Sequence, residues 1–170
     1  MFRKSLLSLA VAAVAVFSFA SNAETFAADQ PTEGARVVFK YLEDRDYSPR
    51  YDSDNDIIFE NDGSTYLVVF DEDDEIFFRI LYINFYTYKN ENELYRSFVA
   101  ANKVNKTTKA AKVIVPEQYV EDPERIFDSP VIAIEAFSKD PYEFARTIPR
   151  SLSAITTAAK EFRSAMRNDD

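Results

Sequence analysis

Three aspartates at alternating positions, Asp52, Asp54 and Asp56, have the spacing with which a calcium-binding loop begins. The rest of such a loop does not follow. Ile57 stands where the sharp turn needs glycine, and Gly63 stands where the bidentate glutamate belongs. We therefore predict no metal site, and interpret the segment as a solvated loop leading into a strand, with a cation site as the alternative.

A second acidic run occupies residues 71–75, with the sequence DEDDE. It lies between two apolar runs, which indicates the tip of a hairpin. Charges this dense need hydration and discourage edge-to-edge pairing of strands. They would also attract a weakly held cation or a basic partner. We favour a role in solubility, and keep cation binding as the alternative.

Glu135 interrupts an apolar, strand-like run at 131–137. If this carboxyl group were buried, its pKa would be raised and it could act as a general acid, with Asp140 or Asp128 as its partner. Two-acid hydrolysis also needs a cleft, which the sequence does not show. Arg79, in a similar apolar run, is the more natural partner. We therefore predict no catalytic residue, and keep a carboxylate-dependent hydrolase as an alternative.

Two asparagines, Asn102 and Asn105, are three residues apart on a predicted helix, beside apolar positions. Buried amides must be hydrogen-bonded. We expect both side chains to face inward and to clamp the helix to a neighbouring loop or strand. Contacts to a ligand are the alternative.

The composition excludes several kinds of chemistry. The chain contains no cysteine and no histidine, which removes thiolate metal sites, disulfides and triads that use a histidine base. Only two glycines are present, so glycine-rich phosphate loops are absent, and we expect no cofactor. The net charge of −9 argues against nucleic acid and anionic membranes as partners.

The N-terminal residues 1–23 have the pattern of a secretory signal peptide. Arg3 and Lys4 precede an apolar stretch that is too short to span a membrane, and small residues end at Ala23. We predict cleavage near Ala23, with Ala28 as the alternative, a flexible leader at 24–31 and a single domain at 32–168. Without disulfides, the exported chain suits a bacterial periplasm or the medium, with no stable membrane insertion after cleavage.

The spacing of apolar residues predicts the elements that position these groups. Helical periodicity follows Thr32, recurs at 90–106 and returns after Asp140, where Pro149 should kink or split the last helix. Strand-like runs cover 56–60, 65–71, 75–88, 112–118 and 129–137. The order predicts an α+β fold: an antiparallel sheet of about five strands with helices packed on it.

Several segments fit this order of elements: VFKYL at 38–42, the meander at 57–86, FVAANKVN at 98–105, the strand at 112–115 and the apolar last helix. Through these segments, which span about 32–166, the chain resembles the YbjN-like family, which shares the fold of type III secretion chaperones. The resemblance implies a non-enzymatic fold that often dimerises and can hold an extended peptide. It brings no catalytic residues.

We therefore expect an exported, non-catalytic module, chaperone-like, that binds a protein or peptide and forms a homodimer. A structural protein of the cell envelope without a ligand is a further alternative. Binding would bury exposed apolar surface on the long strand and on the last helix. The residues expected to form that surface are Phe77, Leu81, Ile83, Phe85, Ile148, Leu152, Ile155 and Phe162.

Overall fold

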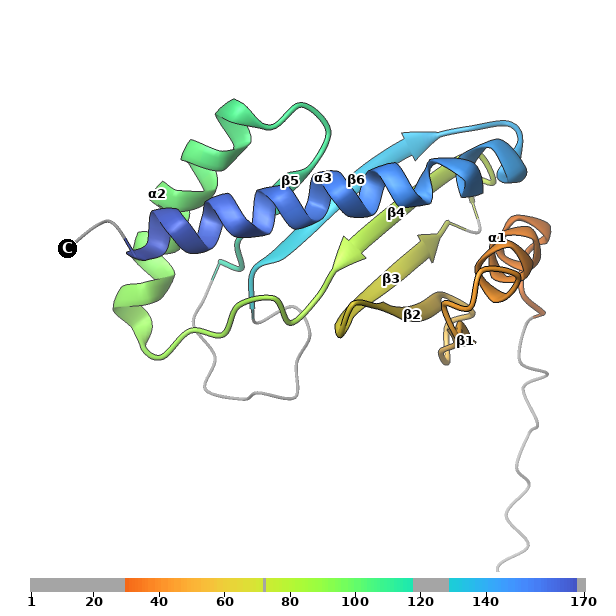
Figure 1. Cartoon of the computed structure of the whole chain (residues 1–170), viewed down its shortest axis with the longest axis horizontal. Helices are drawn as coiled ribbons and strands as arrows, with labels where there is room; N and C mark the ends of the chain where they lie inside the picture. Colours follow the sequence, from red (N-terminus) through yellow and green to blue (C-terminus); the bar gives the residue numbers. More distant parts are fainter. Residues whose placement is uncertain (1–29, 72, 118–128, 168–170) are drawn as a thin grey trace, which may run out of the picture.

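One antiparallel sheet forms the centre of the molecule, with its strands in the order β1-β2-β3-β4-β6-β5 (Figure 1). The computed structural model describes residues 30–71, 73–117 and 129–167. The elements are α1 (Glu33–Glu43), β1 (Arg50–Tyr51), β2 (Ile57–Asn61), β3 (Ser64–Phe70), β4 (Phe77–Tyr82), α2 (Glu91–Thr107), β5 (Lys112–Ile114), β6 (Val131–Phe137) and α3 (Pro141–Arg167).

This arrangement confirms the predicted α+β fold. The sheet has six strands because Arg50 and Tyr51 pair with Ile58 and Ile57 to form the short edge strand β1. Two residues are too few to display the alternation that identifies a strand in a sequence.

All three helices contribute to a core on one face of the sheet. Alternate side chains of the central strands point to that face and pack against the apolar stripe of α3, which crosses the sheet in Figure 1. Burial of each large apolar side chain contributes about 1.5–3 kcal/mol. The largest fully buried side chains include Phe59, Tyr66, Phe78, Ile80, Ile132, Ile148, Ile155 and Phe162.

The first and last helices begin at the predicted capping residues. Thr32 Oγ1 accepts a hydrogen bond from the N–H of Ala35 at 3.1 Å, and Asp140 Oδ1 accepts one from the N–H of Tyr142 at 2.8 Å. In each cap, the side-chain oxygen accepts a hydrogen bond from a backbone N–H that has no acceptor within the helix. The first helix lies against the N-terminal end of the last, where the rings of Tyr41 and Tyr142 are 6.2 Å apart (Figure 1).

Pro149 does not split the last helix, because α3 continues through it. The proline ring lies on the exposed side, while Ile148 and Leu152 are buried against the sheet. One backbone hydrogen bond is lost at a proline. The apolar contacts on both sides of Pro149 outweigh that loss and hold the helix together.

The predicted turn at 61–63 joins β2 to β3. Asp62 and Gly63 have φ angles of 49° and 70°, and Asn61 pairs with Ser64 across the turn. Positive φ at both central residues is typical of a type I′ hairpin, whose twist matches the flanking strands.

β4 ends at Tyr82, whereas the apolar pattern predicted a strand as far as residue 88. Asn84 has a left-handed φ of 56°, which takes the chain out of the extended conformation. The carbonyl of Phe85 then accepts two hydrogen bonds from the Arg163 guanidinium of α3, at 2.8 and 3.2 Å. The segment after Tyr82 is therefore fastened to α3 and does not continue the sheet.

Several predictions concern residues outside the described ranges. These residues are the signal peptide at 1–23, the leader up to residue 29, Glu72 of the acidic run, Gln118 at the end of a predicted strand, Asp128 as a partner of Glu135, and residue 168 at the end of the predicted domain. Among the described residues, no helix combines the length and apolarity that a membrane span requires.

Candidate functional site

The apolar stripe of the last helix is not a surface. Ile148, Leu152, Ile155 and Phe162 are all buried in the core between α3 and the sheet. The prediction that they form an exposed binding surface is wrong, because the stripe is the inner face that holds α3 on the sheet. An apolar helical stripe alone does not distinguish these two roles.

The four strand residues of the predicted surface divide between the two faces of the sheet. Leu81 and Ile83 are buried in a small cluster on the face away from the helices, and Phe85 turns into the main core. Phe77 is half-buried on the same face as Leu81, where its ring lies 5.4 Å from that of Phe137. Of these four side chains, therefore, only Phe77 retains substantial exposure.

Glu135 lies on this second face and is paired with Arg79. The Glu135 carboxylate accepts hydrogen bonds from Arg79 Nε at 2.9 Å and contacts Arg79 Nη2 at 2.6 Å. The two residues face one another on β4 and β6, and both side chains are substantially exposed. This is the ion pair expected for Glu135, and the exposed carboxylate lacks the buried setting that the general-acid alternative would need.

Asn105 is the predicted clamp. Its Nδ2 donates to the carbonyl of Val113 at 3.0 Å, and its Oδ1 accepts from the N–H of Val113 at 2.8 Å. These two bonds tie α2 to β5. Asn102 is exposed, so the prediction that it faces inward is wrong. The inner face of α2 at this turn is formed by Ala101 and Val104.

The acidic loop at 52–56, before β2, is stabilised by hydrogen bonds between its own residues. Asp52 Oδ1 accepts hydrogen bonds from the N–H groups of Asp54 and Asp56, at 2.9 and 3.0 Å. Asp56 Oδ1 accepts one from the N–H of Phe70 at 2.9 Å, which attaches the loop to the end of β3. Among the described residues, no group of three or more acidic side chains is arranged to hold a metal ion.

The C-terminal half of β6 has a free edge. β4 pairs with β6 as far as Phe137, whereas β5 pairs on the other side only with residues 131–133. The N–H of Ser138 donates to the carbonyl of Ile76, toward β4. Because backbone groups alternate along a strand, those of Glu135 and Phe137 point away from β4, where no described strand pairs with them.

A hollow of about 380 Å³ adjoins this free edge. One wall is the end of β6, and the other is formed by the first turns of α3. Phe137 is 69 % exposed, whereas Phe144 is buried beneath the hollow. The hollow is lined by Ala136, Phe137, Ser138, Glu143, Phe144, Arg146 and Thr147. Backbone donors and acceptors therefore lie beside a partly apolar depression.

No sequence signal pointed directly to this site. The sequence predicted that β5 begins at residue 112 and that β6 ends at Phe137, as observed. Only the pairing register, however, shows that β5 and β6 overlap by three residues. α2 ends at Thr107, so the chain has four residues in which to turn before β5 begins. That short connection leaves no residues to pair with the rest of β6.

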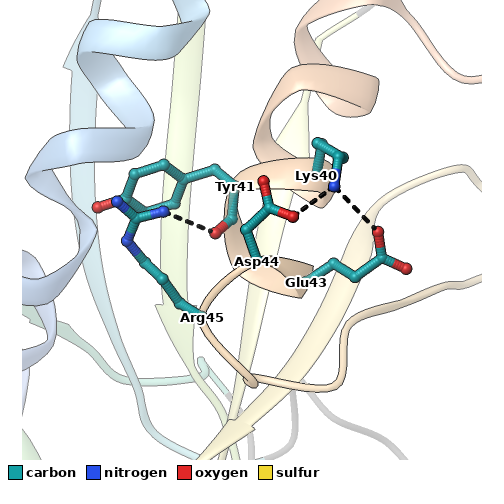
Figure 2. Close-up of polar contacts among 5 residues, drawn as sticks. All are labelled: Lys40, Tyr41, Glu43, Asp44 and Arg45. Atoms are coloured by element: carbon teal, nitrogen blue, oxygen red, sulfur yellow. Dashed lines mark hydrogen bonds and ion pairs between the residues drawn. The ribbon is translucent and has the colours of Figure 1, made fainter.

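A second hollow, of about 430 Å³, lies beside α1 and is lined partly by basic side chains. Figure 2 shows that two of them, Lys40 and Arg45, contact neighbouring groups. Lys40 contacts the carboxylates of Asp44 and Glu43, and Arg45 lies 3.7 Å from the centre of the Tyr41 ring and donates to the Tyr41 carbonyl at 3.3 Å. Because Lys40 and Arg45 are already engaged, we assign no anion site to this hollow.

Comparisons of the chain with protein-family models, with curated proteins and with solved structures found no match.

Proposed function

We propose that this chain is an exported, non-catalytic module that binds an extended peptide segment of a partner protein along the free edge of β6. The observation that carries the proposal is the unpaired stretch of β6 beside the hollow at the start of α3.

The backbone supports an extended polypeptide as the ligand. The N–H and C=O groups of Glu135 and Phe137 point outward with the spacing of a β-strand, and an added strand would continue the sheet in line with β5. Strand addition of this kind obtains affinity from main-chain hydrogen bonds. Proteins usually cover or charge their free edges, because such edges otherwise recruit other chains.

The side chains around the edge indicate which peptides would fit. Alternate residues of an added strand point to opposite faces of the sheet. One residue would enter the hollow above Phe144, and its neighbour would lie against the exposed ring of Phe137. We therefore expect a segment with two consecutive apolar residues. Charged residues flanking them would meet Arg146 or Glu143.

The N-terminal pattern and the resemblance to YbjN-like proteins support the remaining parts of the proposal. The predicted signal peptide directs the chain to the periplasm or the medium. The resemblance implies a fold that holds extended peptide without catalysing a reaction. The exposed Arg79–Glu135 ion pair agrees with this, because it leaves Glu135 without the buried setting of a general acid.

The proposal is tested with peptides selected from a random library displayed on phage, followed by fluorescence anisotropy of the selected peptides with the purified chain. We expect micromolar binding by peptides with two adjacent apolar residues. Recovery of no peptide that binds above background would contradict the proposal.

Two substitutions at Phe137 separate the backbone contribution from that of the ring. Phe137→Pro removes the outward N–H without removing a hydrogen bond to β4, whereas Phe137→Ala removes the ring and keeps the N–H. We expect Phe137→Pro to bind about tenfold more weakly than Phe137→Ala, since one hydrogen bond is lost and the proline ring obstructs the edge. Equal affinity of the two variants would show that the peptide does not pair with β6.

A further inference from the structure

Most of α2 and the turn after it carry positive charge without negative charge. Residues 94–116 contain one arginine and four lysines and no aspartate or glutamate, although the whole chain has a net charge of −9. The total charge, which argues against an anionic membrane as partner, therefore does not describe this part of the molecule. Figure 1 shows α2 crossing the C-terminal end of α3, away from α1 at the other end of the molecule.

Exposed apolar side chains accompany these lysines on the outer side of α2. Tyr95, Phe98 and Val99 are 61 %, 43 % and 63 % exposed, although residues on the inner side of the helix are buried in the core. At 3.6 residues per turn, they share an arc of about 140° with Lys103 and Lys106. The exposed turn that follows adds one more lysine. We call this the lysine–aromatic surface, and it consists of Tyr95, Phe98, Val99, Lys103, Lys106 and Lys109.

The lysines of this surface are available to a ligand. Lys103, Lys106 and Lys109 are exposed, and none of them forms an ion pair with a carboxylate in the described part of the chain. Lys112 donates to the carbonyls of Asn105 and Thr108 at 3.1 and 3.2 Å. The C-terminal end of a helix has a partial negative charge, which repels anions. Because Lys112 covers two of the carbonyls there, it offsets that repulsion.

We propose that the lysine–aromatic surface docks on the surface of an anionic phospholipid bilayer. The lysine ammonium groups contact lipid phosphates, and Phe98 and Val99 lie at the boundary between the headgroups and the acyl chains. Tyr95 suits the same boundary, because its ring is apolar and its hydroxyl group is polar. The contact is peripheral and reversible. It does not involve the β6 edge, so it does not depend on the proposed peptide binding.

The kinds of residue favour a lipid surface over an acidic protein. Lysine is depleted in protein–protein interfaces, whereas arginine is enriched and pairs with carboxylates through its planar fork. The free cations here are lysines, whose flexible side chains can reach phosphates that have no fixed positions. The one arginine of the segment, Arg96, points into the molecule and donates to the carbonyl of Met166 at 2.6 Å.

The acidic groups near α2 determine its orientation on the bilayer. Glu91 and Glu93 lie in its first turn, and Tyr95 donates a hydrogen bond to Glu91 at 3.3 Å. Near the last turn, Glu161 of α3 accepts a hydrogen bond from Thr107 at 2.9 Å. Two acidic groups at the start of α2 and three free lysines at its end mean that the C-terminal end of α2 faces the bilayer.

Flotation with lipid vesicles tests the proposal. The full chain is expressed in bacteria, purified from the soluble fraction and mixed with vesicles at low and high salt (on the order of 50 mM and 500 mM). The vesicles contain phosphatidylglycerol and phosphatidylcholine in equal parts, or phosphatidylcholine alone. We expect binding to the anionic vesicles at low salt, and at least tenfold weaker binding at high salt or without phosphatidylglycerol. No binding to the anionic vesicles, or equal binding to both kinds, would overturn the proposal.

Charge variants test the location of the contact. The triple variant Lys103→Gln, Lys106→Gln and Lys109→Gln should bind anionic vesicles about a hundredfold more weakly, at about fivefold for each lysine. Glu161→Gln removes a negative charge beside the surface, and should strengthen binding about two- to fivefold. Circular dichroism shows whether each variant is folded.

The matched control removes three exposed cations toward the α1 end of the molecule: Arg36→Gln, Lys139→Gln and Arg150→Gln. We expect this control to change the affinity by less than about threefold, since these charges lie farther from the bilayer than a Debye length. All variants keep the same N-terminal segment, so any contribution of that segment to binding is common to them. Equal losses in the two triple variants would show that binding follows total charge, and would overturn the proposal.

The chain has no tryptophan, so a single introduced one reports insertion. The emission of Phe98→Trp should shift to shorter wavelength with anionic vesicles and be quenched by brominated acyl chains. Phe137→Trp makes the same change at the exposed end of β6, and its emission should stay the same. The reverse result would overturn the proposal by placing the contact at β6. Binding of soluble polyglutamate without binding of vesicles would also overturn it, because the surface would then fit an acidic protein.

Discussion

The carboxyl group of Asp56 makes a specific prediction about stability and pH. This side chain is half-buried and accepts a hydrogen bond from the N–H of Phe70 at 2.9 Å. The pKa of Asp56 is raised to about 6 from the ordinary 3.8, and burial is the main cause. The Phe70 hydrogen bond lowers it, and the charges of Asp52 and Asp54 raise it.

The sign of the effect follows from proton binding. Because the pKa is higher in the folded chain than in the unfolded chain, the folded chain binds more protons between about pH 4 and pH 6. The contribution of Asp56 to the free energy of unfolding must therefore fall as the pH rises through that interval. Above pH 6, the folded chain carries a charged carboxylate in a place that favours the neutral acid.

Replacing Asp56 by asparagine removes that charge and keeps the oxygen that accepts from Phe70. A pKa change of about 2 units corresponds to about 3 kcal/mol, at 1.36 kcal/mol per unit. The side chain is only half-buried, so screening by solvent reduces this to about 1–2 kcal/mol. We expect Asp56→Asn to be more stable than the unmodified chain by that amount at pH 7, and nearly equal to it at pH 4.

The measurement is urea unfolding followed by circular dichroism at each pH from 4 to 8. The difference between the free energies of unfolding of the two chains at each pH removes the effect of the titrating groups that both chains contain. Asp73→Asn is the matched control, since it makes the same chemical change at an exposed position, and it should change stability by less than about 0.5 kcal/mol. A difference between Asp56→Asn and the unmodified chain that does not vary with pH would refute the reasoning, as would a less stable variant at pH 7.

Two further predictions concern side chains whose partners the structure identifies. Asn105→Ala removes both bonds to Val113 and should lower the free energy of unfolding by about 1–3 kcal/mol. Asn102→Ala, on the exposed side of the same helix, should change it by less than about 0.5 kcal/mol, and equal effects in thermal unfolding would contradict the clamp. Glu135→Gln should cost less than about 1 kcal/mol, because its ion pair with Arg79 is exposed, and the cost should shrink at 1 M salt. A larger loss of unfolding free energy that does not change with salt would contradict the description of this contact as an exposed ion pair.

Local patterns in the sequence were sufficient for most of the elements. The caps at Thr32 and Asp140 and the turn at Gly63 depend on a few neighbouring residues, and each lies where it was predicted. Asn105 was also predicted correctly, since a polar side chain beside an inner helical face needs a hydrogen-bond partner.

Long-range contacts account for the predictions that failed. The apolar residues after Tyr82 continue a strand pattern, but Arg163 of α3 binds the carbonyl of Phe85 and the chain turns away. The α3 stripe has the periodicity of an exposed binding helix and of a core helix alike, and only the position of the sheet distinguishes them. The β6 edge depends on the register of β5, which no local pattern specifies.

Hydrogen exchange of the backbone amides of β6 tests the central claim most directly. It can be measured by NMR on the free chain and again with a selected peptide. We predict an alternation in the free chain, with slow exchange at Ile134 and Ala136, which face β4, and fast exchange at Glu135 and Phe137. The peptide should then protect Glu135 and Phe137. Slow exchange of these two amides in the free chain, or no protection by a peptide that binds, would contradict the account.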